Sequence, residues 1–543
     1  MAERQPRRLP AAFVVAGVSL WMATAGNAAL WRELQSRGVA QAQGGWLLTL
    51  TLAGMLAAAL YALLSLFAWR RVLKPAIVLL LVATAGGAHF MWTYHIVIDS
   101  GMALNTMQTD WHEARALLTP RLVAVVLLGA LLPSWLVWRI GIDHRPWGRQ
   151  ALRNLCGFAA GIAIVAALIL LSFQPLASTM RNHPQLRYLM NPLNQLWAAG
   201  QTALGSRRSK GPVAPLGRDA RLAASAGAKP RLLVLVLGET GRSGNFGVNG
   251  YERDTTPELA QAQAASFRNA WSCGTSTAAS VPCMFSHLGR DGFLARQQDS
   301  ENLLDVLQHA GLAVLWIDNQ PGGCKGVCDR VPTVNTSGLA DPQLCPNGEC
   351  RDEILLQGLD ERLAALPAAR REKGVVLVLH QMGSHGPAYA QRTPPAFKKF
   401  MPECASSNLP DCSSGQLRNA YDNTIAYTDH VLGSTIAWLR QRSDFDGALL
   451  YVADHGESLG ENNLYLHGLP YAIAPDVQKH VPWVTWLAAG FEQGSGPSMQ
   501  CLRARAETRI THDHLFHSVL GLMQVSTSAY RQALDAYAGC GAY

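Results

Sequence analysis

Carboxylate and imidazole side chains follow three apolar runs in the part of the chain after residue 230. The first run ends at Glu239, the second ends at His380 with His385 close behind, and the third ends at Asp454 and His455. If these runs are strands of one sheet, their ends bring oxygen and nitrogen ligands together, which is how a borderline metal such as Zn²⁺ is bound. We therefore predict a metal site at these strand ends.

A second candidate is the segment CGTSTAASVPC, residues 273–283, which places small hydroxyl residues between two cysteines. A threonine hydroxyl is a weak nucleophile, and a metal bound to its oxygen would favour the reactive alkoxide. A short disulfide loop would hold that oxygen in place, and a helix starting here could bind a phosphoryl group at its N-terminus. The residues alone also fit an ordinary capped helix with a stabilising disulfide, and they do not choose among the hydroxyls.

The elements that must position these groups are short apolar runs separated by longer mixed segments. The runs begin at Arg231, Ala313, Val375, Ala448 and Pro482. Continuous runs rich in leucine and β-branched residues fit strands that are covered on both faces. We predict an α/β sandwich with a mostly parallel sheet, whose reactive crevice lies at the carboxyl ends of the strands.

The first third of the chain is far more apolar, in a protein with 49% hydrophobic and 15% charged residues. Its five long runs are near or above the roughly 18 residues of a membrane span, so we predict transmembrane helices rather than buried core helices. A basic start and the sequence ATAGNAA would also suit a cleaved signal peptide, but the spans that follow favour an uncleaved anchor. The runs are Ala11–Leu30, Trp46–Trp69, Pro75–Val97, Leu122–Trp138 and Leu155–Phe173.

Cationic residues lie before the first run and between alternate runs, and the positive-inside rule places them in the cytoplasm. The chain after residue 175 is then outside the cytoplasm. The formal net charge of +8 needs no nucleic-acid partner, because these loops and a basic linker meet anionic lipid headgroups. The residues are Arg4, Arg7, Arg8, Arg70, Arg71, Lys74, Arg139, Arg145, Arg149 and Arg153.

Cysteine usage agrees with an external second half. Cys156 lies in the fifth run, and the ten other cysteines all come after residue 270, as expected for disulfides in an oxidising compartment. Proximity favours five pairs, although connectivity does not follow from sequence; zinc knuckles at CKGVC and CPNGEC are the weaker alternative. The expected pairs are Cys273 with Cys283, Cys324 with Cys328, Cys345 with Cys350, Cys404 with Cys412, and Cys501 with Cys540.

We divide the chain into a transmembrane domain at 1–175, a bridging helix and linker at 176–230, and a catalytic α/β domain at 231–543. The sequence MRNHPQLRYLMNPLNQLW, residues 180–197, predicts an amphipathic helix lying on the membrane. The Gly-, Ala-, Pro-, Ser- and Arg-rich stretch from residue 205 to 230 predicts a mobile tether.

Nearly the whole chain resembles the lipid A phosphoethanolamine transferases, a group of the alkaline phosphatase and sulfatase superfamily that includes the colistin-resistance enzymes. The resemblance lies in GETGRSGNFGVNGYERDTTPEL, SCGTSTAASVPCMFS, GGCKGVCD, LHQMGSHGPAY and DHGESLGENNLYLHGLPYAIAP, and in Asn105, Thr109 and Glu113. It implies five transmembrane helices followed by an α/β sandwich of the alkaline phosphatase/sulfatase type.

The resemblance also implies a role for each matching residue. Thr277 is the nucleophile, and Glu239, Asp454 and His455 join it around one zinc ion. His385 and His467 bind a second zinc or the phosphate and take part in catalysis, and His380 stands nearby. Lys325 contacts the phosphoethanolamine. Asn105, Thr109 and Glu113, spaced four apart on one helix face, approach the donor headgroup.

The implied reaction transfers phosphoethanolamine from phosphatidylethanolamine to lipid A in lipopolysaccharide, through a phosphothreonine intermediate, and gives polymyxin resistance. We expect a monomer in the cell inner membrane with its catalytic domain in the periplasm. The acceptor stays open between a lipid A phosphate and a core sugar. The alternatives are a phosphoglycerol transferase, a zinc phosphatase or sulfatase-like hydrolase, and a non-catalytic membrane sensor with a structural metal.

Overall fold

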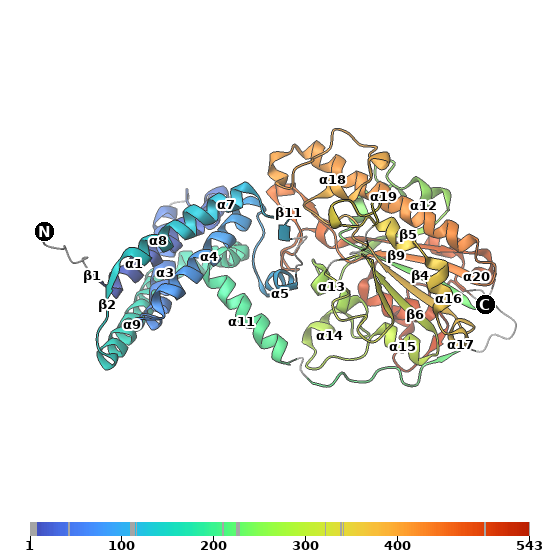
Figure 1. The fold of residues 1–543 in the computed structure, drawn as a ribbon, viewed down its shortest axis with the longest axis horizontal. Coiled ribbons are helices and arrows are strands. Elements are labelled where there is room, and N and C mark those ends of the chain that lie inside the picture. The colour runs from blue at the N-terminus through green and yellow to red at the C-terminus, as the bar shows by residue number, and fades with distance from the viewer. Residues whose placement is uncertain are drawn as a thin grey trace. The chain divides into compact units, whose positions relative to one another are not determined.

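The computed structural model describes residues 8–41, 44–108, 114–115, 117–208, 211–223, 229–320, 322–336, 339, 341–493 and 496–541. The chain forms two compact units (Figure 1). The first comprises Met1–Ala103 and Leu118–Thr202, and the second comprises Leu104–Leu117 and Ala203–Tyr543.

The first unit is helical, and five of its segments are long and apolar enough to cross a membrane, which confirms the five predicted spans. Two spans are composite: α1 (Ala11–Thr24) continues through a 3₁₀ turn into α2 (Ala28–Ser36), and α7 (Pro120–Val126) continues through a π turn into α8 (Leu132–Arg139). The other three are α3 (Gly45–Leu66), α4 (Leu73–Thr93) and α9 (Trp147–Leu171). A short helix, α5, covers Ser100–Gln108.

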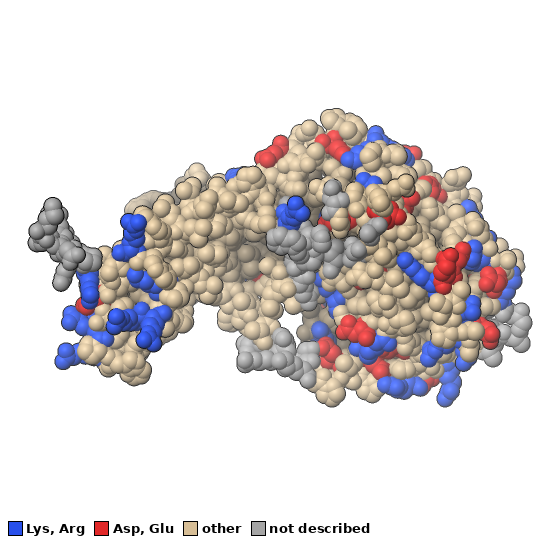
Figure 2. Space-filling model, viewed as in Figure 1, with Lys and Arg blue, Asp and Glu red and all other residues tan. Residues whose placement is uncertain are grey.

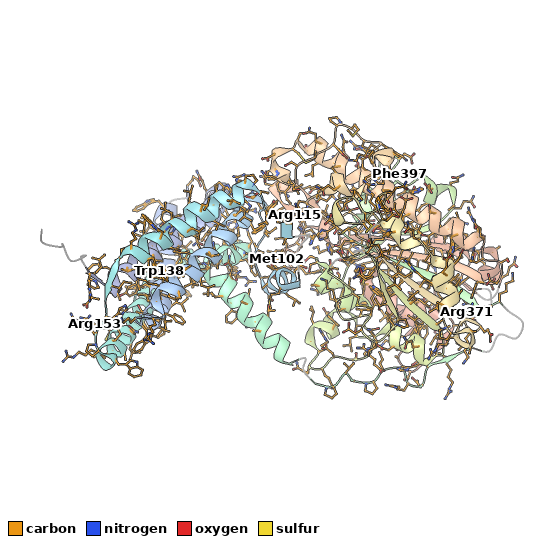
Figure 3. All side chains as sticks on the ribbon, viewed as in Figure 1. Met102, Arg115, Trp138, Arg153, Arg371 and Phe397 are labelled. Atoms are coloured by element: carbon orange, nitrogen blue, oxygen red, sulfur yellow. A yellow bond between two sulfur atoms is a disulfide. The ribbon has the colours of Figure 1, made fainter. Side chains whose placement is uncertain are left out.

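Lys and Arg gather at the end of this unit where β1 (Arg8–Pro10) pairs with β2 (Gly141–Asp143), as Figure 2 shows. We expected Arg149 and Arg153 in a loop, but α9 begins at Trp147 and includes both residues in its first two turns. Figure 3 shows Arg153 at this end of the unit. Long cationic side chains can extend along a helix to reach headgroups, so the helix need not stop before them.

The bridging segment differs from the prediction of one amphipathic helix over 180–197. It contains α10 (Phe173–Asn182), a 3₁₀ turn (Pro184–Leu189) and α11 (Leu193–Arg208). The breaks fall at Pro184 and Pro192, because proline has no N–H to donate within a helix.

The predicted tether is partly packed within the second unit. Ala214 exchanges backbone hydrogen bonds of 2.8 Å with the segment Asp299 to Glu301, and β3 (Arg221–Leu222) pairs with β14 (Val525–Ser526). Arg218 also forms an ion pair with Glu301 at 2.7 Å. The described residues from 211 to 223 therefore lie on the domain surface, and composition alone could not foresee these specific partners.

An eight-stranded sheet forms the centre of the second unit, in the order β13-β5-β12-β9-β4-β8-β6-β7. All pairs are parallel except those that β12 makes with β9 and β5, so the predicted mostly parallel sheet is confirmed. The strands are β4 (Arg231–Gly238), β5 (Ala265–Trp271), β6 (Ala313–Asp318), β7 (Thr333–Asn335), β8 (Val375–His380), β9 (Asp446–Ala453), β12 (His480–Leu487) and β13 (Ile510–Thr511).

Every residue of β4, β6 and β8 is buried, because helices cover both faces of the sheet (Figure 1). The longest, α19 (Ser414–Arg440), packs against α12 (Pro257–Gln261) and α18 (Tyr389–Arg392). Further helices of this unit are α13 (Thr277–Met284), α14 (Gly289–Ala295), α15 (Leu303–His309), α16 (Leu359–Ala365), α17 (Ala368–Arg371), α20 (Ala489–Gln493), α21 (Met499–Ala504) and α22 (Leu515–Leu522).

All five expected disulfides are present: Cys273–Cys283, Cys324–Cys328, Cys345–Cys350, Cys404–Cys412 and Cys501–Cys540. The alternative of zinc knuckles at CKGVC and CPNGEC is therefore wrong, because their sulfurs are bonded to each other. Cys156 is free.

Candidate active site

The carboxyl ends of β4 and β9 lie side by side and deliver the first two candidate ligands. Gly238 pairs with Ala453, so the residues that follow them, Glu239 and Asp454, leave the sheet at adjacent positions. Thr240, in a left-handed backbone conformation with φ of 59°, donates its N–H to Asp454 Oδ1 at 3.0 Å and its hydroxyl to Glu239 Oε1 at 2.7 Å. The turn thereby fixes both carboxylates.

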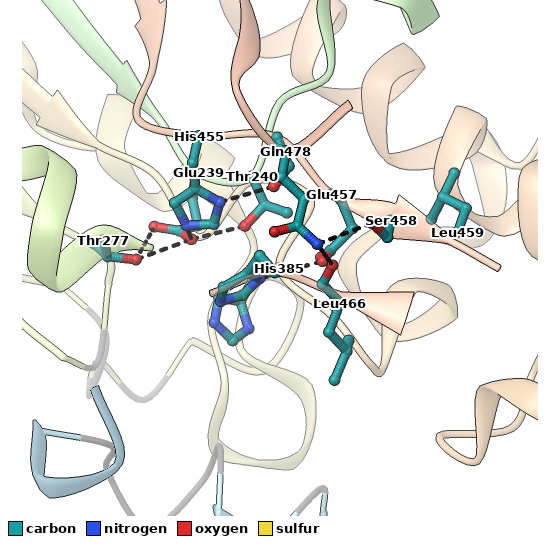
Figure 4. A network of polar contacts seen from close by, with 12 residues as sticks. Glu239, Thr240, Thr277, His385, His455, Glu457, Ser458, Leu459, Leu466 and Gln478 are labelled. Carbon is teal, nitrogen blue, oxygen red and sulfur yellow. Dashed lines mark hydrogen bonds and ion pairs between the residues drawn. The ribbon is translucent and has the colours of Figure 1, made fainter. Parts of the chain in front are cut away.

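Thr277 contacts Glu239 directly, and both side chains are buried. The Thr277 hydroxyl donates toward both oxygens of Glu239, at 3.1 and 3.0 Å, as Figure 4 shows. Thr275 instead donates to the Leu469 carbonyl at 2.6 Å. The structure therefore distinguishes the two threonines, and the one that the resemblance selected lies against the predicted ligands.

His455 completes a group that could hold a metal ion. Ligand atoms of Glu239, Asp454 and His455 all lie within 4.8 Å of one another. His455 Nδ1 lies 2.9 Å from the Gly456 carbonyl, which can only accept, so Nδ1 carries the proton. In the neutral ring, Nε2 then directs its lone pair at the carboxylates, 3.2 Å from Glu239 and 3.4 Å from Asp454.

The electrostatics of this group also favour a bound cation. Burial opposes a charged imidazole, yet Asp454 and Glu239 raise the pKa of His455 to about 10. Burial and the charge of Glu239 raise the pKa of Asp454 to about 7. Burial raises the pKa of Glu239, but the hydrogen bond and charge of His455 outweigh it and hold this pKa well below the ordinary value. The positive charge of one imidazole does not balance two buried carboxylates, and a divalent cation would supply the missing positive charge. The oxygen and nitrogen donors of the three side chains fit Zn²⁺.

Thr277 is the first residue of α13, and the loop before it is held at several points. The Cys273–Cys283 disulfide joins the loop to the helix, and Ser280 accepts the Gly274 N–H at 2.8 Å. The Thr277 hydroxyl therefore lies at the N-terminal end of a helix, where N–H groups favour an anionic group.

His512 is a buried residue of this region that the sequence did not reveal. Its Nδ1 accepts the Cys273 N–H at 3.0 Å, and its Nε2 lies 3.0 Å from the Ala453 carbonyl. It thus connects the loop of Thr277 to the residue before Asp454. Burial lowers the pKa of His512 to about 3, so the ring is neutral and can accept at one nitrogen while donating at the other. The preceding strand β13 has only two residues, too few for an apolar run to mark it.

Arg290 binds the carbonyl of the same residue, Cys273. Its Nε donates to the Cys273 carbonyl at 3.0 Å, and its own N–H is accepted by Asp513 at 2.8 Å. The guanidinium carbon of Arg290 lies 3.9 Å from the ring centre of Tyr471, whose hydroxyl donates to the Ser272 carbonyl at 3.0 Å. Side chains from three further segments therefore fix the loop in addition to the disulfide.

His385 and His467 lie beside the candidate metal group. The ring centre of His467 is 4.3 Å from that of His455 and 5.5 Å from that of His385. His467 Nδ1 contacts Glu457 Oε1 at 3.2 Å, and Glu457 is fully buried. The structure thus brings both histidines to the site. Glu457 follows the same strand as Asp454, but sequence reasoning gave it no role.

His380 ends β8, and its Nδ1 contacts Asp318, the last residue of β6, at 3.1 Å. Its burial opposes the charged imidazole, but the charges of Asp318, Glu239 and Asp454 raise the pKa of His380 above its ordinary value. Lys325 is half-buried between Cys324 and Cys328, in a left-handed conformation with φ of 52°. The contacts of the described residues do not link Lys325 to the carboxylates. Asn105 lies in α5, whereas Thr109 and Glu113 lie outside the described residues.

Two families match the chain in sequence. Residues 231–525 match the family described as sulfatase, and residues 56–205 match the family described as phosphoethanolamine transferase EptA/EptB. Among curated proteins, phosphoethanolamine transferase EptA of Escherichia coli K12 is 39% identical over 490 residues, covering 88% of this chain and 87% of that protein. Phosphatidylethanolamine transferase Mcr-1 of Escherichia coli is 36% identical over 536 residues, covering 96% of each.

A solved structure of similar extent is the integral membrane protein lipooligosaccharide phosphoethanolamine transferase A of Neisseria meningitidis. The TM-score is 0.93 at 36% sequence identity, and the match covers 99% of this chain and 100% of that one. Together with the apolar helices, it shows that this chain is a multi-pass membrane protein.

Proposed function

Because the chain belongs to the EptA family of phosphoethanolamine transferases, we propose that it transfers phosphoethanolamine from phosphatidylethanolamine to a phosphate of lipid A. The observation that carries the proposal is the hydroxyl of Thr277, which lies buried at the start of a helix and donates to a carboxylate of a candidate metal group. A structural capped helix would not need the hydroxyl of its first residue against a buried carboxylate.

Zinc is the proposed cofactor, with Glu239, Asp454, His455 and Thr277 as its ligands. When bound, it lowers the pKa of the threonine hydroxyl and offsets charge on the transferred group. A second zinc, or the phosphate itself, is proposed to bind beside His385 and His467. Lys325 and His380, with Asn105, Thr109 and Glu113, are proposed substrate-binding residues.

In the first step, Thr277 Oγ1 forms a bond to the phosphorus of phosphatidylethanolamine. The bond from phosphorus to the diacylglycerol oxygen breaks, phosphoethanolamine stays on Thr277, and the proton of Thr277 is balanced by the one that diacylglycerol gains. Glu239 accepts the hydrogen bond of that hydroxyl and so orients its oxygen. The N-terminus of α13 faces the transferred group and favours its negative charge.

In the second step, a phosphate oxygen of lipid A bonds to the phosphorus and Thr277 Oγ1 leaves, regaining its proton. The imidazoles of His385 and His467 lie beside the candidate metal group, and Glu457 orients His467. The acceptor phosphate gains an ammonium group, which weakens its attraction for cationic polymyxins. We propose that expression of the protein therefore raises polymyxin resistance.

We place the protein in the inner membrane as a monomer, with the second unit in the periplasm. The disulfides of this unit and the cationic end of the helical unit support this orientation. Donor and acceptor are both lipids, which gives the helical unit a reason to be part of the enzyme.

Mass spectrometry of lipid A from cells with and without this protein tests the proposal. We expect one added phosphoethanolamine group on a phosphate, and its absence in cells that make the Thr277→Ala variant at equal level. Lipid A that stays unmodified, or that gains glycerol phosphate, would contradict the proposal.

A further inference from the structure

Two helices of the first unit, α2 and α7, carry an arginine at the end of their spans that lies away from the cationic loops. The chain runs from β1 through α1 and α2 to Ser36, α4 ends at Thr93, and α7 begins at Pro120. Arg32 lies in α2, near the end of the composite span Ala11–Ser36, and Arg121 is the second residue of α7. Arginine inside or at the edge of a membrane span is costly and usually functional.

Arg32 is held by neutral groups that leave its charge available. Its Nη2 donates to the Met91 carbonyl and to His95 Nδ1, each at 3.4 Å, and its guanidinium lies 4.0 Å from the ring centre of Trp92. The adjacent carboxylate, Glu33, is bound instead by Arg37 at 2.9 Å. A guanidinium offers five donors, and two long hydrogen bonds use few of them.

Arg121 reinforces the positive potential of this region. Its helix, α7, packs against α4, as α2 does, and among the described residues no carboxylate forms an ion pair with it. His89, on α4, is 2% exposed, and neither ring nitrogen has a hydrogen-bond partner in the described part of the chain. Two positive charges close to buried nitrogens without hydrogen-bond partners are unfavourable unless an anion binds among them and offsets the charge.

His95 adds a constrained donor. Because arginine can only donate, His95 Nδ1 accepts from Arg32 and the neutral ring carries its proton on Nε2. Its backbone has φ of 56°, which is unfavourable for a residue with a side chain and is found more often where function requires it. Trp92 is 37% exposed and has the amphipathic character of residues at the headgroup level.

We propose that Arg32, Trp92, His95 and Arg121 form a binding site for the phosphate of a membrane lipid. Two guanidinium groups match phosphate oxygens in geometry and charge, and the apolar helix surfaces beside them suit acyl chains. The proposal rests on the proposed function only in taking the ligand to be a substrate lipid. The phosphate could belong to a glycerophospholipid donor or to lipid A, which share this chemistry.

Native mass spectrometry of the full-length protein in detergent tests the site without requiring turnover. The probes are phosphatidylethanolamine, lipid A and, as a ligand without phosphate, diacylglycerol. For Arg32→Gln and Arg121→Gln we expect affinity for one of the phosphate lipids to fall about tenfold each. The matched control is Arg37→Gln, which removes a paired arginine directly after the same helix and should bind as the parent does. Weaker binding of phosphatidylethanolamine assigns the site to the donor, and weaker binding of lipid A assigns it to the acceptor.

Equal affinity of Arg32→Gln, Arg121→Gln and Arg37→Gln for both lipids would overturn the proposal, as would equally tight binding of diacylglycerol by the parent. His95→Gln, judged by the same criteria, replaces Arg32→Gln if the latter has a lowered melting temperature. Thr277→Ala should still bind the lipid, so a failed proposal here is distinguishable from a failed assignment of the nucleophile.

Discussion

At the scale of single residues, the site depends on buried groups that stabilise one another in pairs. Sequence reasoning found Glu239, Asp454 and His455 because each follows a buried apolar run. The choice of Thr277 over Thr275 needed a resemblance, because the two hydroxyls are alike until the fold directs one to Glu239 and the other to Leu469. His512 could not be found, since only tertiary packing brings it to Cys273.

Removal of His512 tests its positioning role. We expect His512→Ala to lower kcat by about 10- to 100-fold, the usual effect of losing a residue that orients a metal site, with little change in KM. His512→Gln can accept and donate as the ring does and should recover part of kcat. Steady-state kinetics of both variants measure this, and an unchanged kcat in folded His512→Ala would show that the bridge is only structural.

Loss of one carboxylate tests the metal assignment apart from catalysis. Glu239→Gln should bind less than one zinc per chain after dialysis against trace zinc, because a neutral amide cannot balance the cation's charge. Elemental analysis measures zinc content, and Glu301→Gln, which alters an ion pair with Arg218, is the matched control. Full zinc content in Glu239→Gln would contradict the assignment.

At the scale of elements, the central strands of the sheet can be predicted from the sequence, whereas its short edge strands and the bridging segment cannot. The runs at β4, β6, β8, β9 and β12 are continuous and buried, so their pattern predicts strands. The edge strands β7 and β13 have only three and two residues and depend on their neighbours. The bridging segment shows the same limit, because prolines broke the predicted helix and specific hydrogen bonds fixed the predicted tether.

The Cys273–Cys283 disulfide closes a loop that His512 and Arg290 also hold. We expect the double variant Cys273→Ala/Cys283→Ala to lose about 2–3 kcal/mol of stability, seen as a lower melting temperature, and to keep measurable transfer. Cys404→Ala/Cys412→Ala, which opens a loop of similar size, should lose comparable stability with unchanged kcat. Complete inactivity of the first variant while it remains folded would show that the disulfide alone positions Thr277.

At the scale of the whole molecule, the charge pattern predicts how the chain crosses the membrane. In a Cys156→Ala background, a cysteine at Asp291, whose side chain is 98% exposed, should react with a membrane-impermeant maleimide in intact spheroplasts. A cysteine at Arg145, between α8 and α9, should react only after permeabilisation. The reverse pattern of labelling would place the second unit in the cytoplasm.

The covalent step is the central claim, and it can be measured on the Thr277 peptide. Purified protein is incubated with phosphatidylethanolamine labelled in its headgroup, without acceptor, and digested for tandem mass spectrometry. We predict labelled phosphoethanolamine on Thr277 in the parent and, at a lower level, on the hydroxyl of Thr277→Ser, with none in Thr277→Ala. A labelled loop peptide in Thr277→Ala, or transfer to lipid A by that variant, would contradict the account.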